Sequence, residues 1–241
     1  MPDLRLSWKP TDTTLLWSAV SRAIRAPTPF DRDVVELLGG KVFLTGNSQF
    51  QPEVLTAYEV GGRVQSASRL SFSISGYYNE YKDLRSIEPT PTLFVPLYWG
   101  NGMRGETYGL ETWADFQAAP WWRLSASYDL LRERLGFAPG ATGLLGASQA
   151  GDDPQNQATL KSSMDLGRSV TFDADLRYVD ALPDPGVPAY FELNSHVAWK
   201  ITRRVQLSLS GFNLLHPRHQ EYPTPAAAVP RSLFADLRLL F

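Results

Sequence analysis

Histidine and glutamate lie close together near the C-terminus, in the stretch His216-Pro217-Arg218-His219-Gln220-Glu221. Imidazole and carboxylate groups are ligands that zinc accepts, so this stretch could hold a metal ion. Pro217 prevents the helix that would bring both histidines onto one face, and the chain has no cysteine. The surrounding pattern indicates a surface loop in which these side chains are solvated. We therefore predict no metal site here and no cofactor.

Two carboxylates share one face of a predicted strand, because Asp173 and Asp175 are two residues apart, with Arg177 next on that face. A carboxylate pair could serve glycoside hydrolysis. Partners at this spacing beside an arginine are more typical of a charge ladder that lines water. The glycine-rich run 136–151 lacks the Lys-Ser/Thr step of a phosphate loop. With no cysteine and no well-placed Ser/His/Asp set, we predict that the protein is not an enzyme.

The segments that contain these candidate residues show an alternation of apolar and polar residues, which is clearest in the last fifty-odd residues of the chain. Side chains on a strand point alternately to opposite faces, so this period of two predicts strands with one apolar face. Each run is about ten residues long, the length of a tilted strand that crosses a bilayer. In residues 190–200 the apolar set Phe191, Leu193, Val197 and Trp199 alternates with the polar set Glu192, Asn194, His196 and Lys200.

Three stretches carry a family resemblance. They are "WSAVSRAIRAPTPFD" (Trp17 to Asp31), "YGLETWADF" (Tyr108 to Phe116), and "GFNLLHPRHQEY" (Gly211 to Tyr222) followed by "VPRSLFADLRLLF" (Val229 to Phe241). In this order they resemble the C-terminal half of TonB-dependent outer-membrane receptors, whose last strand runs to a terminal Phe.

The resemblance implies that residues 1–241 are the C-terminal part of the β-barrel of such a receptor. The expected fold is all-β and antiparallel, with about eleven long transmembrane strands of a 22-strand barrel, open in this fragment. In that family an N-terminal plug fills the barrel and contacts the TonB energy-coupling protein, and this sequence contains no plug. The expected partners are therefore outer-membrane lipid, the missing plug and barrel half, TonB through that plug, and a small-molecule ligand.

The function implied by the resemblance is energy-coupled uptake of a scarce solute across the bacterial outer membrane, once the missing parts are joined. The solute would be a ferric siderophore, cobalamin or a glycan. The chain begins Met1-Pro2-Asp3 and continues directly into a predicted strand, without an export signal. We therefore expect that an upstream part carries the signal.

The connections between the predicted strands alternate in length. Short turns fall near residues 10, 67, 119, 168 and 203, and long or proline-rich loops near 37, 90, 144, 185 and 223. Bacterial barrels have short periplasmic turns and longer extracellular loops. Aromatic rings prefer the two membrane interfaces, so we predict one girdle at the short turns, formed by Trp8, Trp121, Trp122, Trp199 and Phe241. A second girdle near the loops would include Tyr77, Tyr78, Tyr81, Tyr98, Trp99 and Tyr178.

The long loops are where a receptor would hold its ligand, because they cap a rigid wall. Five side chains there suit an anionic or aromatic chelate: Arg32, Arg85, Tyr98, Trp99 and Arg104.

Composition narrows the alternatives. The formal charge is −2, which excludes the basic footprint of a nucleic-acid-binding protein, and no apolar run is long enough for a membrane helix. Two other functions stay open: a secreted all-β carbohydrate-binding module and a passive outer-membrane porin. A module would bury its apolar residues between two sheets, whereas a membrane wall would expose them in a belt.

Overall fold

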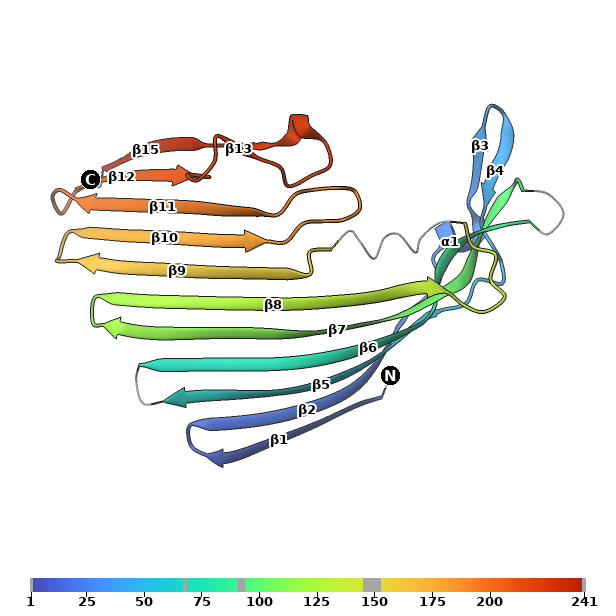
Figure 1. Cartoon of the computed structure of the whole chain (residues 1–241), viewed down its shortest axis with the longest axis horizontal. Helices are drawn as coiled ribbons and strands as arrows, with labels where there is room; N and C mark the ends of the chain where they lie inside the picture. The colour runs from blue at the N-terminus through green and yellow to red at the C-terminus, as the bar shows by residue number, and fades with distance from the viewer. Residues whose placement is uncertain (1, 67–68, 91–93, 145–152, 240–241) are drawn as a thin grey trace.

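The computed structural model describes residues 2–66, 69–90, 94–144 and 153–239 and shows a single large antiparallel sheet with long strands (Figure 1). Eleven strands follow one another in the order β1-β2-β5-β6-β7-β8-β9-β10-β11-β12-β15. This confirms the all-β fold and the eleven predicted wall strands. Their bounds are β1 Asp3–Thr11, β2 Thr14–Arg25, β5 Glu53–Ser66, β6 Leu70–Pro89, β7 Leu97–Ala119, β8 Trp122–Phe137, β9 Asn156–Leu166, β10 Val170–Val179, β11 Tyr190–Lys200, β12 Val205–Phe212 and β15 Ser232–Leu239.

The strand register pairs apolar residues with apolar residues on neighbouring strands, so the alternation seen in the sequence gives the sheet one apolar face. Trp199 pairs with Leu207, and Leu207 pairs with Leu237, so apolar residues follow one another on one face. We call this the apolar face and the opposite one the polar face. The apolar side chains are not covered: Val60 is 63% exposed and Leu209 is 53% exposed. A sandwich would bury them, so the carbohydrate-binding sandwich is excluded.

A smaller unit, which we call the arm, extends from the long-loop end of the sheet. It consists of α1 (Pro29–Asp33), β3 (Val35–Leu38), β4 (Lys41–Thr45) and the far ends of β6 and β7 (Figure 1). The hairpin β3–β4 turns at Gly39 and Gly40, both with positive φ, which suits glycine. β4 also pairs with β7 in parallel. The arm has a small hydrophobic core of Leu44, Phe50, Leu97 and Trp99.

The sequence placed several loop boundaries wrongly. The long loop predicted near residue 37 contains α1, β3 and β4, and β6 continues as far as Pro89, where the next long loop was predicted. Register shifts near Leu84 interrupt β6 there, which weakens the alternation on which the prediction relied. Lys9 to Thr11, predicted as a turn, belong to β1. The last long loop contains β13 (Arg218–His219), η2 (Pro225–Ala227) and β14 (Val229–Pro230).

The sheet is open, because β1 pairs only with β2 and β15 pairs only with β12 among the described residues. Neighbouring wall strands are antiparallel and eleven is an odd number, so β1 and β15 run in the same direction. None of the helices that the structure describes has the length and apolarity needed to cross a bilayer.

Candidate functional site

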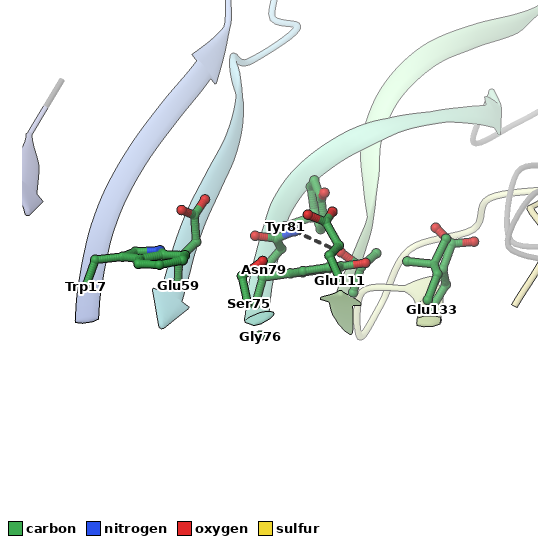
Figure 2. A pocket seen from close by; sticks show the side chains of 11 residues that line it. Trp17, Glu59, Ser75, Gly76, Asn79, Tyr81, Glu111 and Glu133 are labelled. Atoms are coloured by element: carbon green, nitrogen blue, oxygen red, sulfur yellow. Dashed lines mark hydrogen bonds between the residues drawn. The ribbon is translucent and has the colours of Figure 1, made fainter. Parts of the chain in front are cut away.

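The polar face is hollowed where β2, β5, β6, β7 and β8 lie side by side (Figure 2). The hollow has a volume of about 450 Å³. The Trp17 ring lies over Gly61, where a Cβ atom would overlap the ring. The lining is mainly acidic and aromatic. It includes the side chains of Trp17, Glu59, Tyr77, Tyr81, Glu111 and Glu133.

The charge in this hollow is negative, because none of the described residues that line it is basic. Glu111 of β7 also pairs directly with Asp129 of β8. Like charges opposite each other on neighbouring strands are destabilising. Elsewhere on the polar face some carboxylates have a cationic partner: Lys161 Nζ lies 3.2 Å from Asp175 Oδ2. The hollow is therefore suited to receive positively charged groups.

A second cluster on the polar face joins the wall to the loop between β12 and β15. Arg177 of β10 donates to Glu192 Oε2 at 2.6 Å and to Glu221 Oε1 in the loop. Glu221 Oε1 lies 2.9 Å from His219 Nε2, and the His219 ring stacks on Tyr190 at 4.4 Å. The prediction that His219 and Glu221 are simply solvated was wrong, because His219 is 7% exposed. His216 is exposed, as predicted.

Glu192, His219 and Glu221 bring three metal-ligand atoms within 4.8 Å of one another. Burial alone would raise the pKa of the Glu221 carboxyl, but the His219 hydrogen bond and the Arg177 charge outweigh it and lower that pKa. The guanidinium of Arg177 bridges both carboxylates. It thus supplies the positive charge that a metal ion would bring, and the cluster works as an ion-pair network that fixes the loop.

Four of the five predicted ligand residues lie in the arm or at its base. Arg32 Nη2 donates to the Phe50 carbonyl at 3.3 Å. Arg85 donates to Asp31 Oδ1 at 3.3 Å and lies 4.6 Å over the Trp99 ring, which is buried. Tyr98 is half-buried where β7 pairs with β4. Arg104 is separate from them, since it shares the apolar-face side of β7 with Glu106.

Asp31 is the centre of this region, and sequence reasoning missed it. Its side chain is fully buried and contacts Arg25 at 3.0 Å and Arg85 at 3.3 Å. Burial would raise the pKa of Asp31, but hydrogen bonds from Thr28 and Arg25 hold it well below its usual value. Thr28 and Asp31 also form a capping box at the start of α1. That three-residue spacing was the signal available in the sequence.

Four of the aromatic residues predicted to form the girdle at the short turns lie in the described part of the chain, and their place at a membrane interface stays a prediction. Trp8 is 64% exposed, and Trp121 and Trp199 are also exposed. Trp122 is half-buried and donates from Nε1 to Ser162 Oγ at 3.0 Å. Phe241 lies outside the described residues.

At the other end of the strands, the tyrosines Tyr58, Tyr78 and Tyr108 are direct neighbours across β5, β6 and β7 on the apolar face. Tyr178 of β10 packs against Phe191 of β11 on the same face, with ring centroids 4.8 Å apart. The second predicted girdle was partly wrong, because Tyr77 and Tyr81 line the polar hollow and Trp99 is in the core of the arm.

A one-layer antiparallel sheet with an exposed apolar face and a polar opposite face defines a membrane-barrel wall as the class of this fold. The model of the family "TonB dependent receptor-like, beta-barrel" matches residues 1–214, and the chain belongs to this family. No curated protein matches the chain by sequence.

Solved structures agree in fold. The pyoverdine outer membrane receptor FpvA from Pseudomonas aeruginosa PAO1 has a TM-score of 0.74 and 17% identity, covering 100% of this chain and 36% of that one. The siderophore receptor PirA from Acinetobacter baumannii has a TM-score of 0.73 and 15% identity, with 100% and 41% coverage. The copper transporter OprC has a TM-score of 0.71 and 17% identity, with 99% and 39% coverage. The chain thus spans about two fifths of the length of these structures.

Proposed function

We propose that this chain is part of the wall of an outer-membrane receptor that imports a scarce solute by energy coupling. The observation that carries the proposal is the apolar face, which stays exposed along the whole sheet while the opposite face is polar. Lipid would cover the apolar face and water would fill the polar one. The family match supports the same assignment.

The aromatic rows fit the thickness of a membrane. Phe191 and Trp199 of β11, like Tyr108 and Phe116 of β7, are eight residues apart on the apolar face. At 3.3 Å per residue this is about 26 Å along a strand, close to the ~25 Å apolar band of such barrels. The short turns would face the periplasm, and the arm would lie outside the cell.

The open edges support a proposal for the partner that would close the barrel. Because β1 and β15 run in the same direction, two copies of this sheet would meet in parallel rather than antiparallel pairs. An antiparallel closure requires a complement whose two edge strands both run the opposite way, which means an odd number of strands. The eleven remaining strands of a 22-strand barrel satisfy this condition.

The acidic hollow supports a plug as the second partner. Glu59, Glu111 and Asp129 have no ion pair within 4 Å among the described residues. Basic side chains of a plug segment inside the barrel would compensate these carboxylates. TonB would then act on the chain only through that plug.

We propose the solute class from two of the neighbours and from the arm. PirA is described as a siderophore receptor and FpvA as a pyoverdine receptor, so we propose a ferric siderophore as the solute. It would enter past the arm, where Arg32, Arg85, Tyr98 and Trp99 are the proposed contacts; Arg104 is not among them, because it lies on the apolar-face side of β7. Arg85 is bonded to Asp31 and Trp99 is buried, so these two residues would form a rigid surface for the solute rather than move to contact it.

The experiment joins the chain to the polypeptide encoded immediately upstream of it and expresses both with an export signal. We expect heat-modifiable migration on a gel and iron uptake from a siderophore that stops when TonB is deleted. A passive porin would give TonB-independent permeation, and failure of the joined protein to become heat-modifiable would reject the barrel.

A further inference from the structure

Two neighbouring short turns gather positive charge at one end of the sheet. They are residues 167–169, between β9 and β10, and residues 201–204, between β11 and β12 (Figure 1). Four cationic residues in or next to these turns are exposed, and we call them the basic patch: Arg168, Lys200, Arg203 and Arg204. None of the four has an ion pair among the residues that the structure describes. Asp165, the acidic residue closest to them in sequence, lines a hollow of the polar face. The patch therefore carries uncompensated positive charge in a chain whose formal charge is −2.

The backbone holds the two turns side by side. The Lys200 amide donates to the Ser169 carbonyl at 2.7 Å, which joins one turn to the other. Within the second turn, Thr202 Oγ1 accepts a hydrogen bond from the Arg204 amide at 3.1 Å. The first turn contains Gly167 with a φ of +73°, a conformation that suits glycine. The backbone positions of the basic patch are thus fixed, although its side chains are exposed.

Exposed apolar side chains lie directly beside this charge. Leu166, Trp199 and Ile201 are each between 45% and 47% exposed. Leu166 and Trp199 both pair with Val170, so they follow one another on the apolar face. Tryptophan prefers the interface between lipid and water, and arginine and lysine extend their charged ends from an apolar surface into water. The surface therefore changes from apolar to cationic at the ends of these strands.

The other short turns do not gather charge in this way. Lys9 and Asp12 balance each other at the turn between β1 and β2. The turns β5–β6 and β7–β8 have one described cation each, Arg69 and Arg123. The basic patch is therefore a local feature of two adjacent turns rather than a general property of this end of the sheet.

We propose that the basic patch binds an anionic phospholipid of the periplasmic leaflet. The lipid phosphate contacts Arg168, Arg203 and Arg204, and the acyl chains lie along Trp199 and Leu166. An acidic soluble protein would match the charge but would leave these two apolar side chains uncovered. Each lysine or arginine near an anionic membrane surface strengthens binding about fivefold, so the patch selects a lipid with net negative charge over a zwitterionic one. The proposal rests on the proposed membrane wall, which brings lipid to this level.

The test is native mass spectrometry of the full chain in detergent micelles, with phosphatidylglycerol and zwitterionic phosphatidylcholine of the same acyl chains as probes. We expect phosphatidylglycerol to bind at least tenfold more tightly, because only its head group has a net charge. Replacing both Arg203→Gln and Arg204→Gln should weaken phosphatidylglycerol binding about thirtyfold and leave phosphatidylcholine binding unchanged. Replacing both with lysine keeps the charge and should retain most of the binding.

Arg69→Gln, at an exposed arginine of a separate short turn, is the matched control and should bind phosphatidylglycerol as the unmodified chain does. Equal binding of the two lipids, or an equal loss in Arg69→Gln and in the double glutamine variant, would overturn the proposal. Glycerol phosphate supplies the same anion without acyl chains. If it displaces phosphatidylglycerol completely, the patch is a site for a soluble anion and the lipid proposal is also overturned. None of these results affects the barrel proposal, which depends on heat-modifiable migration and TonB-dependent uptake.

Discussion

The wall and the arm are built from the same chain by opposite rules. The wall is one sheet thick, and its apolar residues, such as Ile74, stay exposed on one face. The arm buries Leu44, Phe50, Leu97 and Trp99 against one another, although its strand β3 leaves Val35, Leu37 and Leu38 exposed. An apolar face without a protein cover is stable only where the surrounding medium is itself apolar. On the proposed membrane wall, the boundary between lipid and water would therefore lie within β6 and β7, which belong to both regions.

The largest effect is expected for a charge on the lipid side of the wall. Ile74 and Ser75 are adjacent on β6 and point to opposite faces. Ile74→Arg should destabilise the membrane-inserted protein by about 3 kcal/mol, as for arginine near the midplane of other barrels. Ser75→Arg, the matched control, places the same charge beside Glu59 and Glu111 and should cost little. Urea unfolding in lipid vesicles measures both, and equal losses would contradict the assignment of the two faces.

A somewhat smaller effect is expected in the arm. Asp31→Ala removes two ion pairs and the capping box of α1, and it should destabilise the arm locally by about 2 kcal/mol. Hydrogen exchange should show faster exchange for the amides of Gly46 and Asn47, which bond to Val34 and Asp31, and no change in the wall. Asp33→Ala, at an exposed neighbour, is the control. A loss spread through the wall strands would show that the two regions are not independent.

Acid should separate the two regions without any substitution. The pKa of Asp31 is lowered in the folded arm, so its stabilising contribution is complete above the pKa of the unfolded chain. It is lost as the pH falls below about 4 towards the folded value. Amide exchange in the arm should therefore stay constant between neutral pH and about pH 5, after correction for intrinsic rates, and accelerate below that range. Faster amide exchange in the arm at neutral pH than at acid pH would contradict this prediction.

The smallest effect concerns the carboxylates of the polar face. Glu111→Gln removes the repulsion with Asp129 and should stabilise the isolated chain by about 0.5 kcal/mol. Asp175→Asn, which loses its ion pair with Lys161, should instead destabilise slightly. Denaturant titrations of the two variants in micelles give the comparison. In the presence of a basic plug segment the advantage of Glu111→Gln should disappear.

The wall strands could be predicted from the sequence, because the polarity of each residue indicates which face of the sheet its side chain lies on. Trp199, Leu207 and Leu237 alternate with polar neighbours regardless of what lies beyond the strand, so their strands were predicted close to their true bounds. The short strands of the arm could not be predicted from such an alternation. These short strands depend on contacts such as Leu44 with Leu97, so the sequence predicted only a long loop near residue 37.

The candidate sites show the same limit. The charge ladder at Asp173, Asp175 and Arg177 followed from spacing alone, and the register confirms that they share a face. The partners of Arg177 did not follow, because Glu192 and Glu221 lie 15 and 44 residues away. Burial of His219 depends on how the last loop folds back onto Tyr190, and no local pattern encodes that path.

The parallel pairing of β4 with β7 has a consequence for how the molecule is assembled. Thr45 donates to the Leu97 carbonyl across 52 residues, so the hairpin is synthesised long before its docking surface exists. Contacts so distant in sequence are slow to form, because the intervening chain must first be ordered. The arm should thus fold last, after β6 and β7 have paired with each other. Its apolar residues then remain open to chaperones during passage to the membrane.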